Sequence, residues 1–395
     1  MTKKSLGYSL ALAGILTLAL NLRGPFTSVA PLLEQIITSL SLSTASAGIV
    51  TGLPLLAFAL ISPFGANAIK HLGTERSLVL ALLFIAGGIG LRSAGAIPTL
   101  YLGTLLLGAG IALGNVLLPV VVKTHFPAKI SQLTALYTFT MGIGSTLGAG
   151  LMVPLSTIQS DIMDGWQIAL LFNLLFPVIA LSIWIPLLKK SRSASINRQS
   201  SHRSTRYLLT NPIAWQVTFA LGLNSFTFYS FAGWLPKILN DAGYSEVEAG
   251  MLYAALQFAT MLPGLVLVPF LARCNKRILV TVIASMNVVA ITGLLYFPSL
   301  AMVWCVMFGF CNCATFIMAL SFVGLRTQTT AQAAALSGMA QSFGYAFAAI
   351  GPSLLGLLYS LTNSWTAPLL TVATIAACCA FFSNLSAREQ TICDQ

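Results

Sequence analysis

Long apolar stretches separated by short polar segments dominate this chain. About twelve of them are long enough to cross a bilayer as helices of roughly 20 residues. They lie at approximately 6–32, 46–69, 77–94, 98–122, 131–155, 166–188, 212–238, 245–271, 277–296, 300–323, 333–359 and 364–384. Their length and their lack of period-two alternation predict helices rather than barrel strands. Because 57% of the residues are hydrophobic and only 7% are charged, we expect an all-α integral membrane protein.

One long polar interruption divides the stretches six and six. Residues 189–211 are polar and basic with no apolar period, which predicts a flexible cytoplasmic linker. The chain would then have an N-terminal half at 1–188 and a C-terminal half, ending in a short cytoplasmic tail, at 212–395.

The two halves show weak internal similarity. A shift of 202 residues lays Gly48 on Gly250 and Gly142 on Gly344, at corresponding places in the predicted helices. Two parallel six-helix halves joined by a cytoplasmic loop are the architecture of the major facilitator fold, with 12 transmembrane helices and alternating access to a site near the midplane.

The basic residues predict the orientation. If the N-terminus is cytoplasmic, all of the 20 lysines and arginines except Arg23, Arg92 and Lys237 fall on the inner side. We therefore expect a multi-pass protein of a bacterial-type cytoplasmic (inner) membrane with both termini cytoplasmic. The net charge of +11 then reflects topology, and no nucleic-acid partner is expected.

The motifs of other protein classes are missing from the sequence. There is no phosphate-binding loop for a primary pump, and the seven cysteines lie in or beside apolar stretches without metal-ligand spacing. We expect no enzyme activity, cofactor or metal. The expected partners are a small-molecule substrate and membrane lipid, and the protein is expected to be a monomer.

Arg23 is the only charged residue well inside an apolar stretch. A charge there costs about 2.5–3.5 kcal/mol on insertion scales, so it usually faces a cavity or a partner. Its planar donor fork suits a carboxylate, a nitro group, a cyanate-like anion or a ring nitrogen. The alternative is that Arg23 snorkels outward or binds carbonyl groups of neighbouring helices. Gly24-Pro25, directly after it, predicts a kink or local opening of the first helix.

Other polar and aromatic residues inside the stretches are further candidates for substrate binding or gating. They are Asn21, Thr27, Asn115, Tyr137, Asn224, Tyr229, Trp234, Gln257, Gln341 and Tyr345. The aromatic ones could stack on a flat heteroaromatic, and each polar one could equally serve as a hydrogen bond between helices. Trp234 could instead be an interface anchor, and Arg92 is expected to contact lipid headgroups or a latch.

Several longer strings carry a resemblance to a known family. They are Asn21-Leu-Arg23, Gly48-x-x-Thr51-x-Leu-Pro54, Gly110-Ile-Ala-Leu-Gly114-Asn115-Val-Leu-Leu-Pro119, Gly233-Trp234-Leu-Pro236 and Ser337-Gly-Met-Ala-Gln341-Ser-x-Gly344-Tyr345. The chain resembles the cyanate/2-nitroimidazole transporter family of the major facilitator superfamily, and the 2-nitroimidazole exporter branch more than the cyanate branch. The resemblance implies a secondary transporter that exports a small planar heteroaromatic. Uptake or exchange of a small anion such as cyanate is the alternative, and a non-transporting membrane sensor is a minor one.

The loop after the second stretch departs from the superfamily pattern. Lys70 stands where the usual aspartate of this loop would be. We therefore expect a different cytoplasmic latch, in which Lys70, Glu75 or Arg76 pairs with Lys123, Arg273 or Arg326.

No carboxylate or histidine lies at mid-membrane depth in the sequence. Glu34 is at the outer end of the first stretch, and the three histidines are on the cytoplasmic side. Coupling could therefore run through Glu34, through protonation of the substrate, or be absent, as in a facilitator or exchanger.

Overall fold

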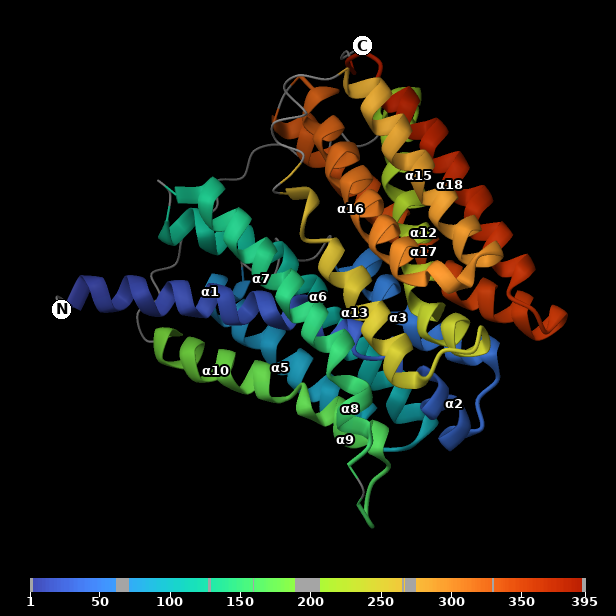
Figure 1. The fold of residues 1–395 in the computed structure, drawn as a ribbon. Coiled ribbons are helices and arrows are strands. Elements are labelled where there is room, and N and C mark those ends of the chain that lie inside the picture. The colour runs from blue at the N-terminus through green and yellow to red at the C-terminus, as the bar shows by residue number, and fades with distance from the viewer. Residues whose placement is uncertain are drawn as a thin grey trace. The chain divides into compact units, whose positions relative to one another are not determined.

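The computed structural model describes most of the chain as helices (Figure 1). The described residues are 3–61, 71–126, 129–158, 160–188, 207–264, 266, 275–328 and 330–392. Lys70, Arg273 and most of the predicted linker lie outside them. Helices lie in every predicted apolar stretch where it is described, and no strand occurs in the described ranges, which confirms the predicted all-α class.

The helices form two compact units that are described separately. Unit 1 contains Met1–Leu42 and Leu56–Ile196, and unit 2 contains Ser43–Leu55 and Asn197–Gln395. The division falls at the predicted linker except in one place. The first part of α3 (Thr44–Ile61) belongs to unit 2, and its last part belongs to unit 1.

Unit 1 is built around its first helix. Its elements are α1 (Lys3–Thr27), η1 (Ala30–Leu32), α2 (Leu33–Leu40), α5 (Thr74–Arg92), α6 (Ile97–His125), α7 (Ile130–Gly150), α8 (Met152–Ser156), α9 (Gly165–Phe172) and α10 (Leu175–Leu187). Helix α1 packs along α7, α6 and α10, and α5 packs along α6. Gly24 and Pro25 lie inside α1, which continues to Thr27, so the predicted opening at this dipeptide is wrong. Pro25 has no N–H to donate to the carbonyl group four residues earlier, so α1 continues through it with one intrahelical bond missing.

Small residues bring the backbones of α1 and α7 together. A Cβ atom at Gly144 would lie 2.6 Å from the carbonyl oxygen of Leu20, and one at Gly24 would lie 2.9 Å from the carbonyl oxygen of Gly144. Such contacts leave no room for a side chain. Gly24 therefore serves helix packing.

Unit 2 is built around α12. Its elements are α12 (Pro212–Asp241), α13 (Glu246–Ala259), α15 (Lys276–Tyr296), η5 (Pro298–Leu300), α16 (Ala301–Leu325), α17 (Thr330–Thr362) and α18 (Thr366–Ser386). The start of α12 is set by Asn211, whose side chain accepts hydrogen bonds from the amides of Ile213 and Ala214, with Pro212 in the first helical position. Helix α12 packs along α17 and α18.

The first part of α3 packs backbone to backbone on α17 within unit 2. A Cβ atom at Gly48 would lie 2.5 Å from the carbonyl oxygen of Pro352, and one at Gly52 would lie 2.5 Å from that of Ala349. Because Gly48 and Gly52 are four residues apart, they lie on one face of α3. This spacing explains why this segment joins unit 2.

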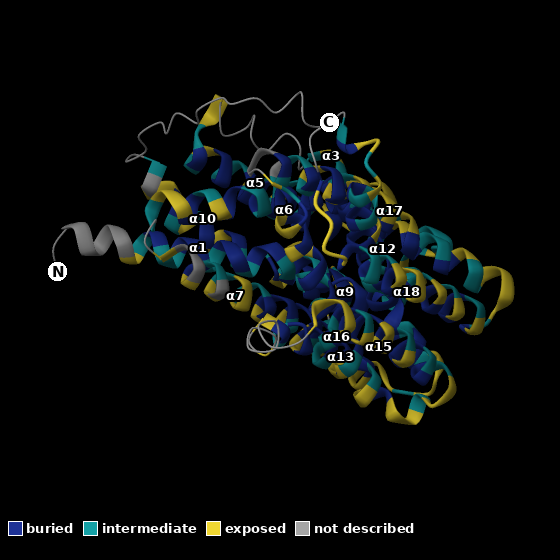
Figure 2. Cartoon of the chain, turned by 90° about the horizontal axis from the view of Figure 1, so that it is seen from above, coloured by how far each residue is buried: buried dark blue, intermediate teal, exposed yellow. Residues whose placement is uncertain are grey.

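The outer faces of the helices are apolar, as expected for lipid contact. Large exposed hydrophobic residues occur along several of them, for example Leu60, Leu83, Leu102, Val178 and Phe381. Figure 2 shows exposed and half-buried residues running along the helices rather than only at their ends. In the described part of the chain, nine helical segments are long and apolar enough to cross a membrane. The protein is therefore a multi-pass membrane protein.

Candidate functional site

Arg23 lies in the last turn of α1 with a half-buried side chain. Among the residues that the structure describes, its guanidinium group has neither a hydrogen-bond partner nor an ion-pair partner. It therefore does not bind carbonyl groups of neighbouring helices there, which was one of the two structural alternatives. A partly accessible guanidinium with five donors is available to an acceptor from outside the unit.

The turn that carries Arg23 is fixed to α7 by Thr27. The Thr27 hydroxyl lies 3.0 Å from the carbonyl oxygen of Ser145 and also within hydrogen-bond distance of the carbonyl oxygens of Arg23 and Gly24. Thr27 is 4% exposed, so its hydroxyl is occupied inside unit 1. This candidate orients α1 instead of offering a free polar group.

The remaining candidates of unit 1 bond mainly within their own helices. Asn21 is buried and its Nδ2 donates to the carbonyl oxygen of Thr17 at 2.7 Å, while no partner of its Oδ1 occurs among the described residues. Asn115 is half-buried and donates to the carbonyl oxygen of Ile111 at 3.0 Å. Tyr137 is half-buried and hydrogen-bonds the Thr134 side chain. Asn115 and Tyr137 are therefore partly accessible, and Asn21 is not.

Arg92 is placed differently from the prediction. Its side chain is 0% exposed, so it does not contact lipid headgroups. Its Nη1 donates to the carbonyl oxygen of Pro25 at 2.9 Å, and its Nη2 to the hydroxyl of Ser28 at 3.2 Å. The predicted headgroup contact is wrong, because the position of Arg92 at the end of an apolar stretch does not reveal that α5 ends against the end of α1.

Two candidates of unit 2 are occupied by interhelical bonds. Asn224 Nδ2 donates to Asn312 Oδ1 at 3.3 Å, and Asn312 Nδ2 donates to the carbonyl oxygen of Asn224 at 3.3 Å. The Trp234 indole donates to the carbonyl oxygen of Pro352 at 2.8 Å, and Trp234 is fully buried. Full burial excludes the position at the membrane interface that was the alternative for Trp234.

Three candidates of unit 2 are accessible. Tyr229 on α12 and Tyr345 on α17 are half-buried, with ring centroids 6.5 Å apart and planes inclined by 57°. Gln341 is exposed, four residues before Tyr345 on the same face of α17, and its Nε2 donates to the Ser337 hydroxyl at 2.9 Å. These three side chains form an accessible aromatic and amide surface. Gln257, in contrast, is buried and hydrogen-bonds Tyr253.

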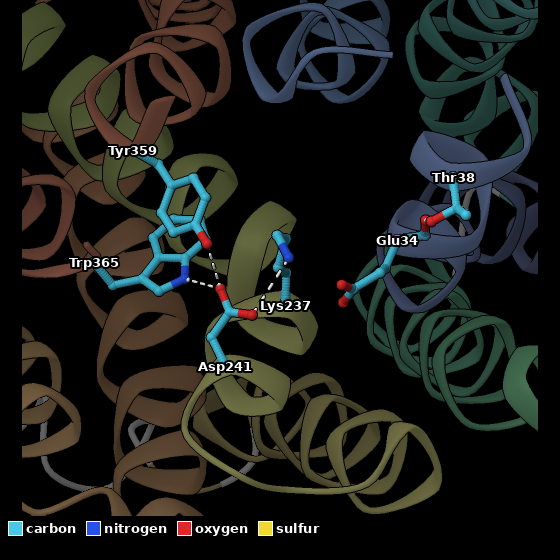
Figure 3. Close-up of polar contacts among 6 residues, drawn as sticks. All are labelled: Glu34, Thr38, Lys237, Asp241, Tyr359 and Trp365. Carbon is cyan, nitrogen blue, oxygen red and sulfur yellow. Dashed lines mark hydrogen bonds and ion pairs between the residues drawn. The ribbon is translucent and has the colours of Figure 1, made fainter. Parts of the chain in front are cut away.

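A tryptophan and an aspartate are joined at one end of each unit, which sequence reasoning missed. In unit 2, Asp241 accepts hydrogen bonds from the Trp365 indole at 2.8 Å and the Tyr359 hydroxyl at 2.9 Å (Figure 3). Lys237 lies 3.4 Å from the other carboxylate oxygen. The cluster ties the end of α12 to the end of α17 and the start of α18.

Unit 1 has a similar arrangement. Asp164 accepts from the Trp166 indole at 3.1 Å and from the Ser39 hydroxyl, and it caps α9 together with Gln167. In the sequence, these pairs show only as a tryptophan near the start of a helix and an aspartate beside a helix terminus. Trp365 precedes α18 and Asp241 ends α12, whereas Asp164 precedes α9 and Trp166 lies in its first turn.

Glu34, the acid at the outer end of the first predicted stretch, lies in the first turn of α2 and is half-buried. The Thr38 hydroxyl donates to its carbonyl oxygen at 3.0 Å (Figure 3). The acid thus lies beyond the end of α1, on a separate short helix.

The predicted latch residues have other neighbours within their own units. The Glu75 carboxylate lies 3.8 Å from His125 Nε2, and Arg76 and Lys123 are exposed. In unit 2, Arg326 Nε donates to the carbonyl oxygen of Ser386 at 2.8 Å. Burial lowers the pKa of Arg326 and nearby Glu389 opposes the shift. Lys70 and Arg273 lie outside the described residues.

The described residues offer no group of three or more histidine, cysteine, aspartate and glutamate side chains that could hold a metal ion. Among the candidate residues described above, the accessible groups are the Arg23 guanidinium, amides and aromatic rings.

The sequence model of the Major Facilitator Superfamily matches residues 11–349. The chain belongs to the Major Facilitator Superfamily. Because the fold, the apolar helices and the family agree, it is a membrane transporter of this superfamily.

Three similar proteins refine this assignment. The chain is 44% identical over 382 residues to the 2-nitroimidazole transporter of Escherichia coli, covering 96% of each chain. It is 26% identical over 354 residues to the cyanate transport protein CynX of Escherichia coli, covering 89% of this chain and 90% of CynX. It matches the crystal structure of a D-xylose-proton symporter with a TM-score of 0.77 at 13% identity, covering 98% of this chain and 100% of that one. The resemblance inferred from the motifs, closer to the 2-nitroimidazole branch than to the cyanate branch, is confirmed.

Proposed function

We propose that this transporter exports a small planar heteroaromatic of the 2-nitroimidazole type by alternating access, with Arg23 as the main polar contact. The observation that carries the proposal is the half-buried Arg23 guanidinium, which has no partner among the described residues. The substrate class follows from the likeness to a 2-nitroimidazole transporter at 44% identity over nearly the whole chain.

The chemistry of Arg23 fits such a substrate. The nitro oxygens and an imidazole ring nitrogen lie in one plane, and a guanidinium presents its donors in a plane. A hydrogen bond that involves a charged group contributes about 1.5–3 kcal/mol. One such bond therefore supports about a tenfold to hundredfold gain in affinity.

Unit 2 by itself offers accessible aromatic and amide groups that suit the same class of substrate. Tyr229 and Tyr345 offer ring faces, and Gln341 offers an amide on the same face of α17 as Tyr345. Aromatic faces favour flat, electron-poor rings over aliphatic solutes of similar size. Asn115 and Tyr137 are the partly accessible groups of unit 1 that could add polar contacts.

The topology forms part of the same proposal. Both termini are on the cytoplasmic side of a bacterial-type inner membrane, as the distribution of lysine and arginine favours. The protein works as a monomer, with membrane lipid and its small-molecule substrate as its only partners. The cytoplasmic latch involves Glu75 and its neighbours on the same side of the membrane.

A second candidate is uptake or exchange of a small anion such as cyanate. Arg23 favours it, because a permanent positive charge without a carboxylate partner attracts an anion. The more distant likeness to CynX supports the same class.

The test is counterflow in proteoliposomes. Purified protein is reconstituted with unlabelled 2-nitroimidazole or cyanate inside, and entry of labelled 2-nitroimidazole or labelled cyanate is followed. We expect exchange of 2-nitroimidazole and little exchange of cyanate. The reverse preference would establish the second candidate, and no exchange of either would reject both. Efflux from intact cells that express the protein, compared with uptake into the same cells, gives the direction.

A further inference from the structure

Arg92 lies where two helices of unit 1 end. It is the last residue of α5, and its guanidinium reaches the end of α1 through the carbonyl oxygen of Pro25 and the hydroxyl of Ser28. The Ser28 hydroxyl also donates to the Pro25 carbonyl at 2.9 Å. The three groups form a closed set of hydrogen bonds inside the unit.

Among the described residues no carboxylate pairs with Arg92, and helix-end carbonyl groups stabilise its charge instead. The carboxyl end of an α-helix carries a partial negative charge from its unpaired carbonyl groups. Arg92 lies at the carboxyl ends of both α5 and α1, and it donates to one of these carbonyls. Its Nε has no hydrogen-bond partner among the described residues. Because moving such a buried cation away from these acceptors is costly, the contact fixes the two helix ends to each other.

The same turn of α1 is fixed on its other side by α7. Thr27 donates to Ser145, and the Gly24 and Gly144 backbones lie in close contact. Arg23 is two residues before Pro25 in this turn. The turn that carries Arg23 is therefore held by contacts from two helices, α7 and α5. Arg92 supplies the contacts from α5.

We propose that Arg92 is a positioning residue for substrate recognition: it holds the last turn of α1 so that the Arg23 guanidinium meets the substrate in a fixed orientation. This inference rests on the proposed function of Arg23. In this role Arg92 orients Arg23 without contacting the substrate itself.

The test is a double-mutant cycle in proteoliposomes with labelled 2-nitroimidazole as the probe. KM and Vmax of counterflow are measured for the native protein, Arg92→Gln, Arg23→Lys and the double variant. We expect Arg92→Gln to raise KM about tenfold, about 1.4 kcal/mol, with Vmax changed less than twofold. In the Arg23→Lys background, where the planar fork is already lost, Arg92→Gln should change KM less than twofold.

Trp184→Phe is the matched control. The buried Trp184 indole donates to the carbonyl oxygen of Gly14, so it anchors the same helix about two and a half turns before Arg23. This variant should lower the melting temperature but leave KM within twofold in both backgrounds. Arg92→Lys, which keeps the charge but loses the fork, is the second variant if Arg92→Gln does not fold, and it should raise KM in the same way.

Four results would overturn the inference. An unchanged KM in the Arg92 variants, or an equal rise of KM in both backgrounds, would make Arg92 a purely structural residue while the role of Arg23 stands. A rise of KM in Trp184→Phe equal to that in Arg92→Gln would show that any loosening of α1 has this effect. Normal counterflow of 2-nitroimidazole by Arg23→Ala would reject the role of Arg23 and the inference together, whereas no counterflow by the native protein would reject the proposed substrate.

Discussion

Each unit packs a pair of helices through glycines, but the polar residues on these helices have different partners in the two units. In unit 1, glycines let α1 and α7 touch through their backbones, and in unit 2 a Cβ atom at Gly222 on α12 would lie 2.9 Å from the Cα of Gly344 on α17. Yet α1 carries Arg23 without a partner among the described residues, whereas Asn224 on α12 is bonded to Asn312. The shared glycine contacts fit two related halves. The polar residues differ because Asn224 joins two helices, whereas Arg23 does not.

This difference distinguishes polar side chains that could bind a ligand from those that hold helices together. A polar group whose hydrogen bonds are satisfied inside its unit gains little from a ligand, because binding would first break an existing bond. Arg23, Gln341 and the pair Tyr229 and Tyr345 keep accessible atoms, and Asn224 and Trp234 do not. The accessible polar group of α1 is therefore a charge, whereas the accessible groups of α12 and α17 are aromatic rings and an amide.

The strongest test of the comparison is the loss of the free charge. Arg23→Ala should reduce 2-nitroimidazole counterflow about a hundredfold, because a charge-assisted contact of about 2.8 kcal/mol disappears. Arg23→Lys should recover only part of the activity, since a point charge lacks the planar fork. Gel filtration of the purified variants checks that both remain folded. Full transport by Arg23→Ala would reduce Arg23 to an outward-pointing structural residue.

The glycine contacts should respond according to their closeness. Gly144→Ala places a methyl group 2.6 Å from a backbone oxygen and should destabilise unit 1 by about 1–3 kcal/mol, read as a lower melting temperature. Gly344→Ala, with 3.1 Å to the Gly222 Cα, should cost less. The control is Gly338→Ala on the same helix as Gly344, where a Cβ atom meets nothing within 4 Å, so stability should hold or rise. Equal losses in all three variants would contradict this ranking.

Breaking the amide pair of unit 2 should affect stability more than recognition. Asn312→Leu leaves the buried Asn224 amide without its partner, at a cost of about 1–3 kcal/mol, while KM for 2-nitroimidazole should change less than about twofold. Because the penalty comes from the unpaired group, Asn224→Leu combined with Asn312→Leu should recover part of the loss. A large rise of KM with normal stability would instead place Asn224 among the recognition residues.

The smallest effects are expected at the two aspartate and tryptophan pairs. Trp365→Phe and Trp166→Phe each remove one indole hydrogen bond to Asp241 or Asp164, which contributes about 1 kcal/mol. Both variants should lower the melting temperature slightly and leave transport unchanged. A difference in transport between the two variants would show that one of these ends has a role beyond holding helices together.

The sequence by itself determined the class of protein, its helical content and its family. The length and continuity of apolar stretches are local properties, so they can be read from the sequence without knowing which helix lies beside which. The singular position of Arg23 was visible for the same reason, because a charge in an apolar stretch is conspicuous in any arrangement. The family strings added a substrate class that composition could not supply.

Only the tertiary structure decided which polar residues are hydrogen-bonded to other helices. Arg92 and Thr27 are bound to helix ends and carbonyl groups more than 60 residues away in the chain, and the first part of α3 joins unit 2 through glycine contacts with α17. Helical periodicity places a side chain on a face but does not say what that face meets. The local opening predicted at Gly24-Pro25 did not occur for a related reason, because contacts with α5 and α7 hold the turn that contains it.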